Sequence, residues 1–254
     1  MEPSSQIPEI NFPINPKDLN AFKQKNPRLI FAIGPHGSGV DTQCTKISNE
    51  FKYTKLILRD LIKSEITKNT PLGQQAKSSF ESHSPIPNDI ISNILLQAII
   101  ESKTKSIIIE GFPRTLEQAL HFETHISPIK HILNFIAPEP TCSRRLSELF
   151  TKRNLPLPSQ EQLQASYEKS TTSIQNVVNF YSQYGIVRTI DADASLSTVN
   201  ERTKPSLFPV MYSIIGKRYS GKTTLSEVLH QHQGIECIDF EKQFKEFKQS
   251  LTEV

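Results

Sequence analysis

Tryptophan is absent from this sequence, and its 254 residues include only two methionines, nine glycines and three cysteines. No apolar run approaches the roughly 20 residues that a membrane-spanning helix requires. Residues 1–25 also lack the apolar middle segment of a secretory signal peptide. These absences argue against a membrane span and against secretion, so the sequence predicts a cytoplasmic protein with no membrane partner.

The cysteines and the charges exclude further classes of protein. Cys44, Cys142 and Cys237 lie far apart and show none of the paired spacings of a zinc site or a disulfide framework, which indicates reduced thiols. The formal net charge is +3, and the lysines are scattered instead of alternating with stacking aromatics. We therefore expect no nucleic acid partner. An apolar fraction of 36% and a charged fraction of 22% are typical of a globular protein.

Short apolar runs alternate with helical stretches along most of the chain. Because alternating strands and helices build a parallel sheet with helices on its faces, the pattern predicts an α/β fold with a doubly wound parallel sheet. The expected strands are residues 28–33, 55–58, 106–109, 131–136 and 186–190. The expected helices are residues 42–51, 60–67, 88–102, 141–152 and 166–184.

Composition divides the chain into three parts. Residues 1–27 carry five prolines and predict an extended Pro-rich arm, which is either a disordered tail or an arm laid on a partner. Residues 28–204 form the first domain, and residues 191–206 at its end are a polar connector. Residues 205–254 repeat the opening pattern but are too few for a second complete domain, so we expect an incomplete second unit. Its expected elements are strands at 210–215 and 235–240 and helices at 223–231 and 241–251.

Residues 216–223 fit the phosphate-binding pattern G-x-x-x-x-G-K-[ST] in full, between an expected strand and an expected helix. In such a loop, backbone N–H groups and the helix N-terminus surround phosphate oxygens. Gly216 and Gly221 bound the turn, Lys222 supplies a positive charge, and Thr223 can ligate magnesium. The segment therefore predicts a nucleotide-phosphate site.

An earlier turn at residues 34–42 has the same glycine skeleton but lacks the lysine. Val40 stands at the lysine position, and Asp41 adds a negative charge beside it. Losing one cation of the transition state typically lowers the rate by roughly 10²–10³. His36 either replaces part of the charge when protonated or is an ordinary loop histidine. The residues of this turn that keep the nucleotide-binding pattern are Gly34, Gly37, Ser38, Gly39 and Thr42.

The segment GPHGSGVDTQC at residues 34–44 resembles the GGPGSGKGTQC opening of the adenylate kinase family. Residues 110–115, with Gln118, resemble the DGFPRT segment and the following glutamine of that family. The resemblance covers roughly residues 28–200. It implies a doubly wound parallel sheet of the P-loop nucleoside monophosphate kinase type, with ATP and AMP as ligands and Mg-ATP as the cofactor.

The resemblance also implies roles for single residues. Arg114 is the expected phosphate-binding arginine of the monophosphate site, and Gln118 is the expected reader of the acceptor base. Arg145 resembles a second phosphate-contacting arginine, and both arginines are catalytic if the chain is active. Glu110 replaces an aspartate that positions magnesium through water. Lys63 keeps a charge in an arginine position, without the bidentate fork that arginine offers a phosphate.

Other positions depart from the family pattern. Residues 57–63 lack the hydroxyl and the glycine of the family's Ser-Thr-Gly-Asp-Leu-Leu-Arg segment, and residues 154–164 contain none of the arginines of the mobile lid. Only Arg153 remains at the edge of the lid, and Ser166 stands at a further arginine position. Because phosphoryl transfer depends on positioned positive charge, these losses remove several kcal/mol of transition-state stabilisation. The sequence thus favours a catalytically impaired adenylate-kinase-like protein that acts as a nucleotide-binding or structural subunit of a larger assembly.

Two alternatives stay open at this point. In the first alternative, the chain is an active kinase that catalyses ATP + NMP ⇌ ADP + NDP, with Lys222, or His36 and Arg145, supplying the missing charge. In the second, it is an ATP-binding switch at residues 216–223, which a partner completes. The tandem arrangement resembles the multi-domain adenylate kinases of cilia and flagella, which implies protein partners in an axonemal assembly.

Overall fold

The computed structural model describes residues 13–82, 84–208, 213–233, 239 and 244. The chain divides into two compact units, Met1–Phe208 and Pro209–Val254. Within the described part of the chain, no helix is both long and apolar enough to span a membrane.

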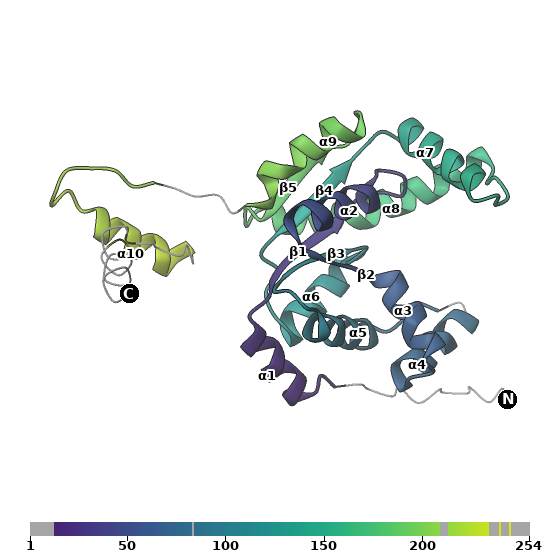
Figure 1. The fold of residues 1–254 in the computed structure, drawn as a ribbon, viewed down its shortest axis with the longest axis horizontal. Coiled ribbons are helices and arrows are strands. Elements are labelled where there is room, and N and C mark those ends of the chain that lie inside the picture. The colour runs from purple at the N-terminus through teal and green to yellow at the C-terminus, as the bar shows by residue number, and fades with distance from the viewer. Residues whose placement is uncertain (1–12, 83, 209–212, 234–238, 240–243, 245–254) are drawn as a thin grey trace, which may run out of the picture. The chain divides into compact units, whose positions relative to one another are not determined.

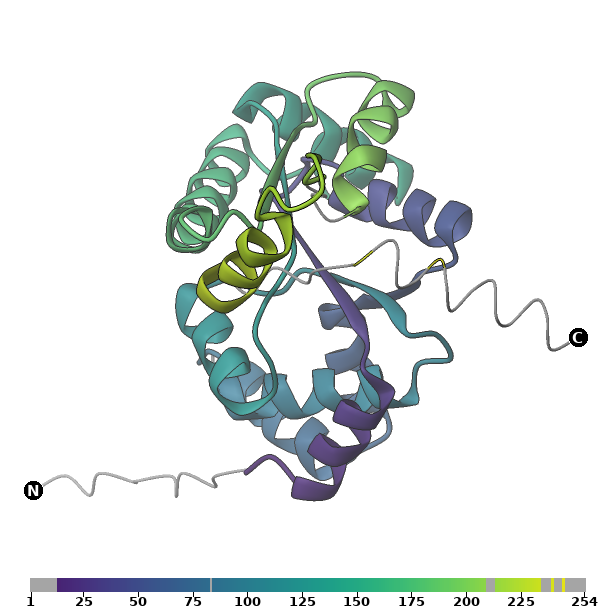
Figure 2. The same ribbon diagram turned by 90° about the vertical axis from the view of Figure 1, so that its left-hand side faces the viewer.

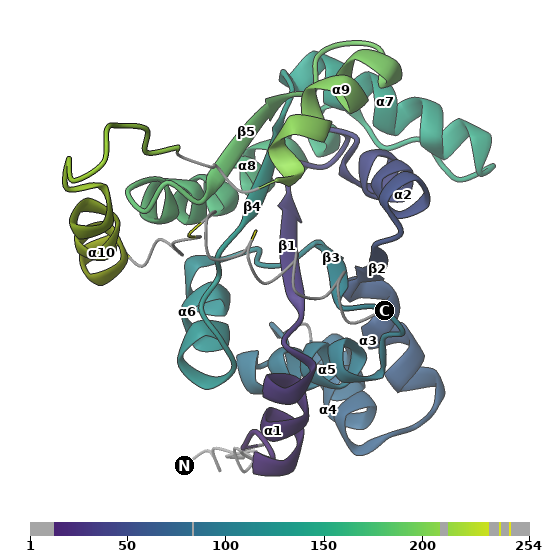
Figure 3. The same ribbon diagram turned by 60° about the vertical axis from the view of Figure 1, so that its left-hand side comes forward.

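The first unit is built on a five-stranded sheet in which all strands are parallel. The strand order is β2-β3-β1-β4-β5, so β1 lies at the centre between β3 and β4 (Figure 3). This confirms the predicted α/β class with a parallel sheet. The strands are β1 (Arg28–Ile33), β2 (Thr54–Ile57), β3 (Ser106–Glu110), β4 (Ile132–Ile136) and β5 (Val187–Asp191).

Helices cover both faces of the sheet, because alternate residues of each central strand point to opposite sides. Phe31 and Ile33 pack with one helical layer, and Ile30 and Ala32 pack with the other. Figure 1 and Figure 2 show α1, in purple, on one side of the sheet and α9, in light green, on the other. The first layer draws buried side chains from α1 (Pro16–Lys25), α3 (Leu58–Thr67), α4 (Pro71–Glu81), α5 (Asn88–Glu101), α6 (Leu116–His125) and α8 (Gln160–Ser182). The second draws them from α2 (Val40–Phe51), α7 (Glu139–Lys152) and α9 (Leu196–Thr203).

The arm expected at residues 1–27 is helical over most of the part that the structure describes, because residues 16–25 form α1. Pro16 occupies the first turn, where its missing N–H has no helical partner to lose, and the Asn15 side chain accepts a hydrogen bond from Lys17 N at 2.9 Å. No further proline follows until Pro27, and Phe22 is buried in the core. The proline count therefore overstated the extended part, and residues 1–12 lie outside the description.

The connector expected at residues 191–206 also contains a helix. Ser195 caps α9 by accepting a hydrogen bond from Thr198 N, and Val199 and Thr203 are buried. A short 3₁₀ turn, η1 (Lys204–Leu207), follows and buries Leu207. These contacts make the connector part of the first unit, and the division of the chain falls four residues later than expected, after Phe208.

In the second unit the structure describes the glycine-rich loop and α10 (Lys222–Gln233). Residues 213–215, the described end of the strand expected at 210–215, are not in a strand. The remainder of that strand and nearly all of the elements expected at 235–240 and 241–251 lie outside the described residues.

Candidate nucleotide site

The loop between β1 and α2 is shaped by two close approaches of its backbone. A Cβ on Gly34 would lie 2.6 Å from Ser38 Oγ and 2.7 Å from Phe135 O, so a side chain does not fit there. Gly37 has a φ of +88° and packs against the backbone of Cys142, which again excludes a side chain. The loop ends at Gly39, and α2 begins at Val40 with the unpaired N–H groups of its first turn. A loop of this form at a helix N-terminus favours an anion.

The loop of the second unit repeats this geometry. A Cβ on Gly216 would lie 2.7 Å from Ser220 Oγ, as the one on Gly34 does from Ser38 Oγ. Ser220 N donates to Lys217 O at 3.3 Å, and Ser38 N donates to Pro35 O at 3.0 Å in the first loop. Both loops therefore have the turn that the shared glycine pattern predicts.

The two loops differ in the side chain that follows the last glycine. Lys222 Nζ crosses its own loop and donates to Gly216 O at 2.9 Å and to Lys217 O at 2.6 Å. The first loop has Val40 at the equivalent place. The second loop therefore encloses a cation, whereas the first loop supplies none from this position.

A lysine on β2 supplies a positive charge next to the first loop. Lys55 Nζ donates to Asp41 O at 3.1 Å, to the Asp41 carboxylate, and to Thr45 Oγ1 at 2.9 Å. It also lies 3.0 Å from Glu110 Oε2. Only 13% of the Lys55 side chain is exposed. One buried ammonium thus pairs with both carboxylates, Asp41 and Glu110.

Strand register explains this contact. Lys55 on β2 pairs with Ile108 on β3, and Ile108 packs in the helical layer that contains α2. Because side chains alternate along a strand, Glu110, two residues after Ile108, points to the same face as Lys55. No local motif marks Lys55; the available signal in the sequence is a lysine inside a short strand that precedes the segment resembling the monophosphate motif.

The ammonium of Lys55 makes three hydrogen bonds in addition to its 3.0 Å contact with Glu110. Its three hydrogen bonds go to Asp41 O, the Asp41 carboxylate and Thr45, and Glu110 Oε2 accepts no hydrogen bond from the described residues. Burial raises the pKa of Glu110 and Lys55 opposes this shift, while the pKa of Lys55 lies above its ordinary value because its contacts outweigh desolvation. Lys55 is therefore firmly charged, and it forms an ion pair with Glu110.

Three side chains follow the three neighbouring strands β2, β3 and β1 at their carboxyl ends. Arg59 lies in the first turn after β2, Arg114 follows β3, and His36 lies in the loop after β1. Arg114 Nε donates to Gly111 O at 3.2 Å. Burial lowers the pKa of Arg114, and so does the nearby charge of Arg59. The end of the sheet thus carries two guanidinium groups, one after each of two adjacent strands.

His36 belongs to the same group but does not add a charge. Burial lowers its pKa below 6.5, and Arg114 and Arg59 lower it further, so the imidazole is neutral at pH 7. Its Nδ1 lies 3.0 Å from Ser166 Oγ on α8. The alternative in which a protonated His36 replaces the loop lysine is therefore not supported.

Arg145 on α7 contacts the first loop through its backbone. Its Nη1 donates to Ser38 O at 3.3 Å, and its Nη2 donates to Ala192 O at 2.9 Å and Ala194 O at 3.2 Å. The side chain ties the loop to the segment after β5. A phosphate contact for Arg145 stays a prediction.

Four further predicted site residues lie on helices. Gln118, in the first turn of α6, accepts a hydrogen bond from Arg114 N at 2.9 Å through Oε1, which places it beside Arg114. Thr42 is exposed in the first turn of α2, Lys63 is exposed on α3, and Thr223 is exposed in the first turn of α10. The structure therefore brings Gln118 next to Arg114, whereas the binding roles of all four stay predictions.

The segment that corresponds to the lid is a short loop between α7 and α8. Ser159 and Gln162 form a capping box at the start of α8, which ends the loop. Leu155 and Leu157 in this loop are exposed. Arginine is absent from residues 154–164, so the loop has no guanidinium to place on a phosphate.

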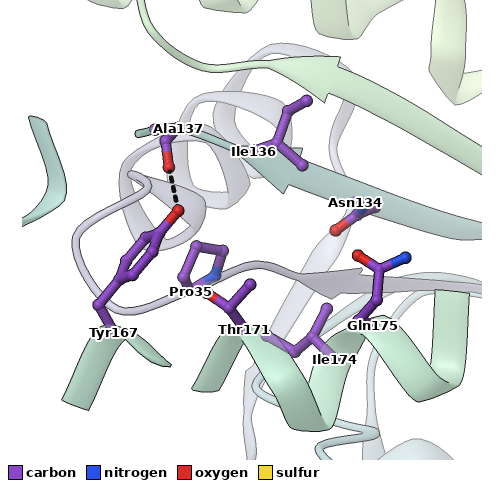
Figure 4. A pocket seen from close by; sticks show the side chains of 8 residues that line it. All are labelled: Pro35, Asn134, Ile136, Ala137, Tyr167, Thr171, Ile174 and Gln175. Carbon is purple, nitrogen blue, oxygen red and sulfur yellow. Dashed lines mark hydrogen bonds between the residues drawn. The ribbon is translucent and has the colours of Figure 1, made fainter. Parts of the chain in front are cut away.

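A small cavity of about 50 Å³ lies between β4 and α8, next to Pro35 of the first loop (Figure 4). Asn134 Oδ1 and Thr171 Oγ1 face it without hydrogen-bond partners among the described residues. This volume is enough for water but not for a nucleotide. The cavity is lined by Pro35, Asn134, Ile136, Ala137, Tyr167, Thr171, Ile174 and Gln175.

The strand order, the glycine loop after the central strand and the arginine after the adjacent strand define a P-loop α/β protein of the nucleoside monophosphate kinase class. The sequence profile of the adenylate kinase family matches residues 32–186, more than half of the chain. The chain belongs to the adenylate kinase family.

The chain matches its relatives over nearly their whole length. It is 27% identical to Adenylate kinase 1 of Schistosoma mansoni over 187 residues, which are 73% of this chain and 95% of the relative. It is 28% identical to Adenylate kinase isoenzyme 1 of Gallus gallus over 183 residues, 71% and 94% of the two chains. It is also 28% identical to Adenylate kinase isoenzyme 1 of Homo sapiens over 179 residues, 70% and 92% of the two chains.

The adenylate kinase family uses ATP with Mg²⁺. The acidic residues of the first site do not fit a divalent cation, because the Lys55 ammonium contacts both Asp41 and Glu110. Among the described residues, no group of three or more His, Cys, Asp and Glu side chains is placed to hold a metal ion. The expected role of Glu110 in positioning magnesium is therefore opposed by a fixed positive charge.

Proposed function

We propose that this chain is an adenylate-kinase-like nucleotide-binding protein with impaired phosphoryl transfer, which acts as a nucleotide-binding or structural subunit of a larger assembly. The observation that carries the proposal is the arrangement around Lys55. Val40 stands at the lysine position of the first loop, and Lys55, which contacts the start of α2, is paired with Asp41 and Glu110. Because these contacts hold its ammonium, we expect Lys55 not to reach a transferring phosphoryl group.

The expected loss of rate is large. Removing one donor to transition-state charge typically costs roughly 10²–10³ in rate, and an arginine supplied to the phosphoryl group is worth roughly 10³–10⁵. The first loop lacks the lysine that would be such a donor, and residues 154–164 lack the arginine. Because these groups act on the same charge, their losses are not simply multiplied.

Nucleotide binding has separate support. The first loop keeps the backbone shape that favours a phosphate, and Arg114 with Gln118 lies on the adjacent strand end. We propose ATP and AMP as the ligands, with Arg114 at the monophosphate. An AMP titration tests this: Arg114→Ala should weaken binding about tenfold or more, since a charged hydrogen bond contributes about 1.5–3 kcal/mol.

The control for this titration is Arg144→Ala. Arg144 lies next to Arg145 on the exposed side of α7, where it pairs with Glu148 at 2.7 Å. It should leave AMP binding unchanged. Equal AMP binding by both variants would show that Arg114 is not part of the site. Absence of AMP and ATP binding in the unmodified chain would overturn the nucleotide-binding proposal.

The alternative is an active nucleoside monophosphate kinase that catalyses ATP + NMP ⇌ ADP + NDP. Its support is the match to proteins named adenylate kinases over more than nine tenths of their length. It requires a cation that replaces the loop lysine, and the neutral His36 is not one. Steady-state turnover separates the two proposals.

The second unit supports an additional ATP site. Its loop repeats the geometry of the first loop and adds Lys222, which lies across the loop carbonyls. We propose that Gly216, Gly221, Lys222 and Thr223 bind the phosphates of Mg-ATP, with a partner completing the unit. The repetition of the loop also supports protein partners in an axonemal assembly and a location in the cytoplasm or cilium, which localisation of the tagged full chain in ciliated cells tests.

A further inference from the structure

We propose that the first site binds the phosphates of a nucleoside triphosphate without magnesium. In this proposal the Lys55 ammonium is the cation beside Glu110, and Arg59 and Arg114 are both phosphate ligands. This inference rests on the proposed nucleotide binding. It names the form of the ligand, the free polyanion, and adds Arg59 and Lys55 to the site.

The first step concerns Lys55. Its Nζ is fixed by Asp41 O, the Asp41 carboxylate and Thr45 Oγ1, and it lies 3.0 Å from Glu110 Oε2. A divalent cation positioned by Glu110 would therefore sit beside a fixed ammonium in a partly buried site, where like charges repel strongly. Displacing Lys55 would break its hydrogen bonds to Asp41 and Thr45. The site thus opposes the metal instead of recruiting it.

The second step concerns the source of positive charge for the phosphates. Lys55 is bound to the carboxylates, and His36 is neutral, so neither provides it. Arg59 and Arg114 follow the adjacent strands β2 and β3, whose ends are in register because Ile57 pairs with Glu110. The charge of Arg59 adds to burial in lowering the pKa of Arg114. Two like charges held together at a strand edge favour an anion between them.

The third step concerns Arg59 itself. Its side chain is 61% exposed, and its Nε lies 3.4 Å from its ion-pair partner, Asp60 Oδ1. In the segment that resembles the monophosphate motif, this arginine stands where the family pattern has glycine. Relative to the family pattern, the chain has therefore lost a cation at Val40 and gained one at Arg59, which lies in the first turn after β2. An arginine fork binds two phosphate oxygens at once, which suits a polyphosphate that carries no metal.

The test is a calorimetric titration of the full chain with ATP, in excess EDTA and in excess Mg²⁺. Both titrations use a Lys222→Ala background, which removes the cation of the second loop. We expect ATP to bind at least as tightly in EDTA as in Mg²⁺. Arg59→Ala should weaken the EDTA titration about tenfold, the loss expected for a charged hydrogen bond, whereas Arg144→Ala should not.

A second variant examines Lys55 directly. Lys55→Gln keeps a polar side chain but removes the ammonium, so Glu110 becomes available to a metal. We expect this variant to bind ATP more tightly with Mg²⁺ than with EDTA, the reverse of the unmodified chain. A circular dichroism spectrum unchanged from that of the parent shows that the variant is folded.

Each outcome bears on one proposal. ATP binding in Mg²⁺ but not in EDTA would overturn the metal-free inference and leave the proposed nucleotide binding intact. Binding in EDTA that Arg59→Ala does not weaken would overturn the role of Arg59. No binding under either condition would overturn the proposed nucleotide binding at the first site, and the inference with it.

Discussion

Lys55 Nζ and Glu110 Oε2 lie 3.0 Å apart on adjacent parallel strands, at the edge of the sheet where the glycine loop begins. The same ammonium pairs with Asp41, the residue after the missing loop lysine. A single lysine therefore neutralises a carboxylate inherited with the family pattern and one that this chain adds. This relationship links the loss of the loop lysine to the altered charge of the whole site.

Replacing Lys55 should destabilise the fold. Lys55→Met leaves Asp41 and the partly buried Glu110 without their cation, at a cost of about 1–3 kcal/mol, reduced from values for fully buried pairs because Asp41 is 65% exposed. Urea unfolding measures the change. Lys77→Met is the control, since its pair with Glu81 is exposed and 3.8 Å long, and should change stability by less than about 0.5 kcal/mol.

The double variant Lys55→Met with Glu110→Gln sharpens this prediction. Removing both charges takes away the uncompensated carboxylate, so the double variant should be more stable than the single Lys55→Met variant. Equal stability of the two would show that the Glu110 contact contributes nothing.

His36 should make stability depend on pH. Its pKa in the folded protein is lowered from 6.5 by burial, then by Arg114 and Arg59, so the unfolded chain binds more protons between the two pKa values. The contribution is complete above 6.5 and is lost as the pH falls through the folded pKa. His36→Gln, which can still bond Ser166, should flatten the fall of the unfolding free energy below pH 6.5.

The other histidines provide the internal control for this experiment. The pKa values of His121 and His131 are also lowered, chiefly by burial, and both residues remain in the variant. Some pH dependence should therefore persist after His36→Gln. A pH profile identical to that of the unmodified chain would contradict the account of His36.

Arg145 should act as an anchor for the first loop. Arg145→Ala leaves the carbonyls of Ser38, Ala192 and Ala194 without this donor, at a cost of about 1–3 kcal/mol. Hydrogen exchange of the loop amides should become faster. Arg145→Lys should recover only part of the loss, because one ammonium does not reproduce the guanidinium fork, and Arg144→Ala should change neither stability nor exchange.

Lys222 should govern phosphate binding in the second unit. Lys222→Ala removes the ammonium that spans Gly216 O and Lys217 O, so a titration of the full chain with Mg-ATP should lose the second-loop component. Lys217→Ala, an exposed neighbour that contributes its carbonyl and not its ammonium, should keep it. Retention of both components in Lys222→Ala would exclude this loop as an ATP site.

The sequence predicted the parallel sheet because its strands are short apolar runs that carry their own local signal. It did not predict α4 or α6, whose residues are largely polar and whose starts depend on the caps Thr70 and Thr115. Motifs identified the glycine loops and Arg114, because their spacing is local. Lys55 was missed because strand register brings it to Glu110, and no local pattern records that register. The contact between His36 and Ser166 joins residues 130 positions apart and was missed for the same reason.

Steady-state phosphoryl transfer from Mg-ATP to AMP tests the central claim most directly. The purified chain is compared with Arg114→Ala, which controls for contaminating host kinase. Kinases typically turn over at about 1–100 s⁻¹. We predict no turnover above the Arg114→Ala background, although the chain binds nucleotide. Turnover in the usual range that Arg114→Ala abolishes would contradict the account and establish an active nucleoside monophosphate kinase.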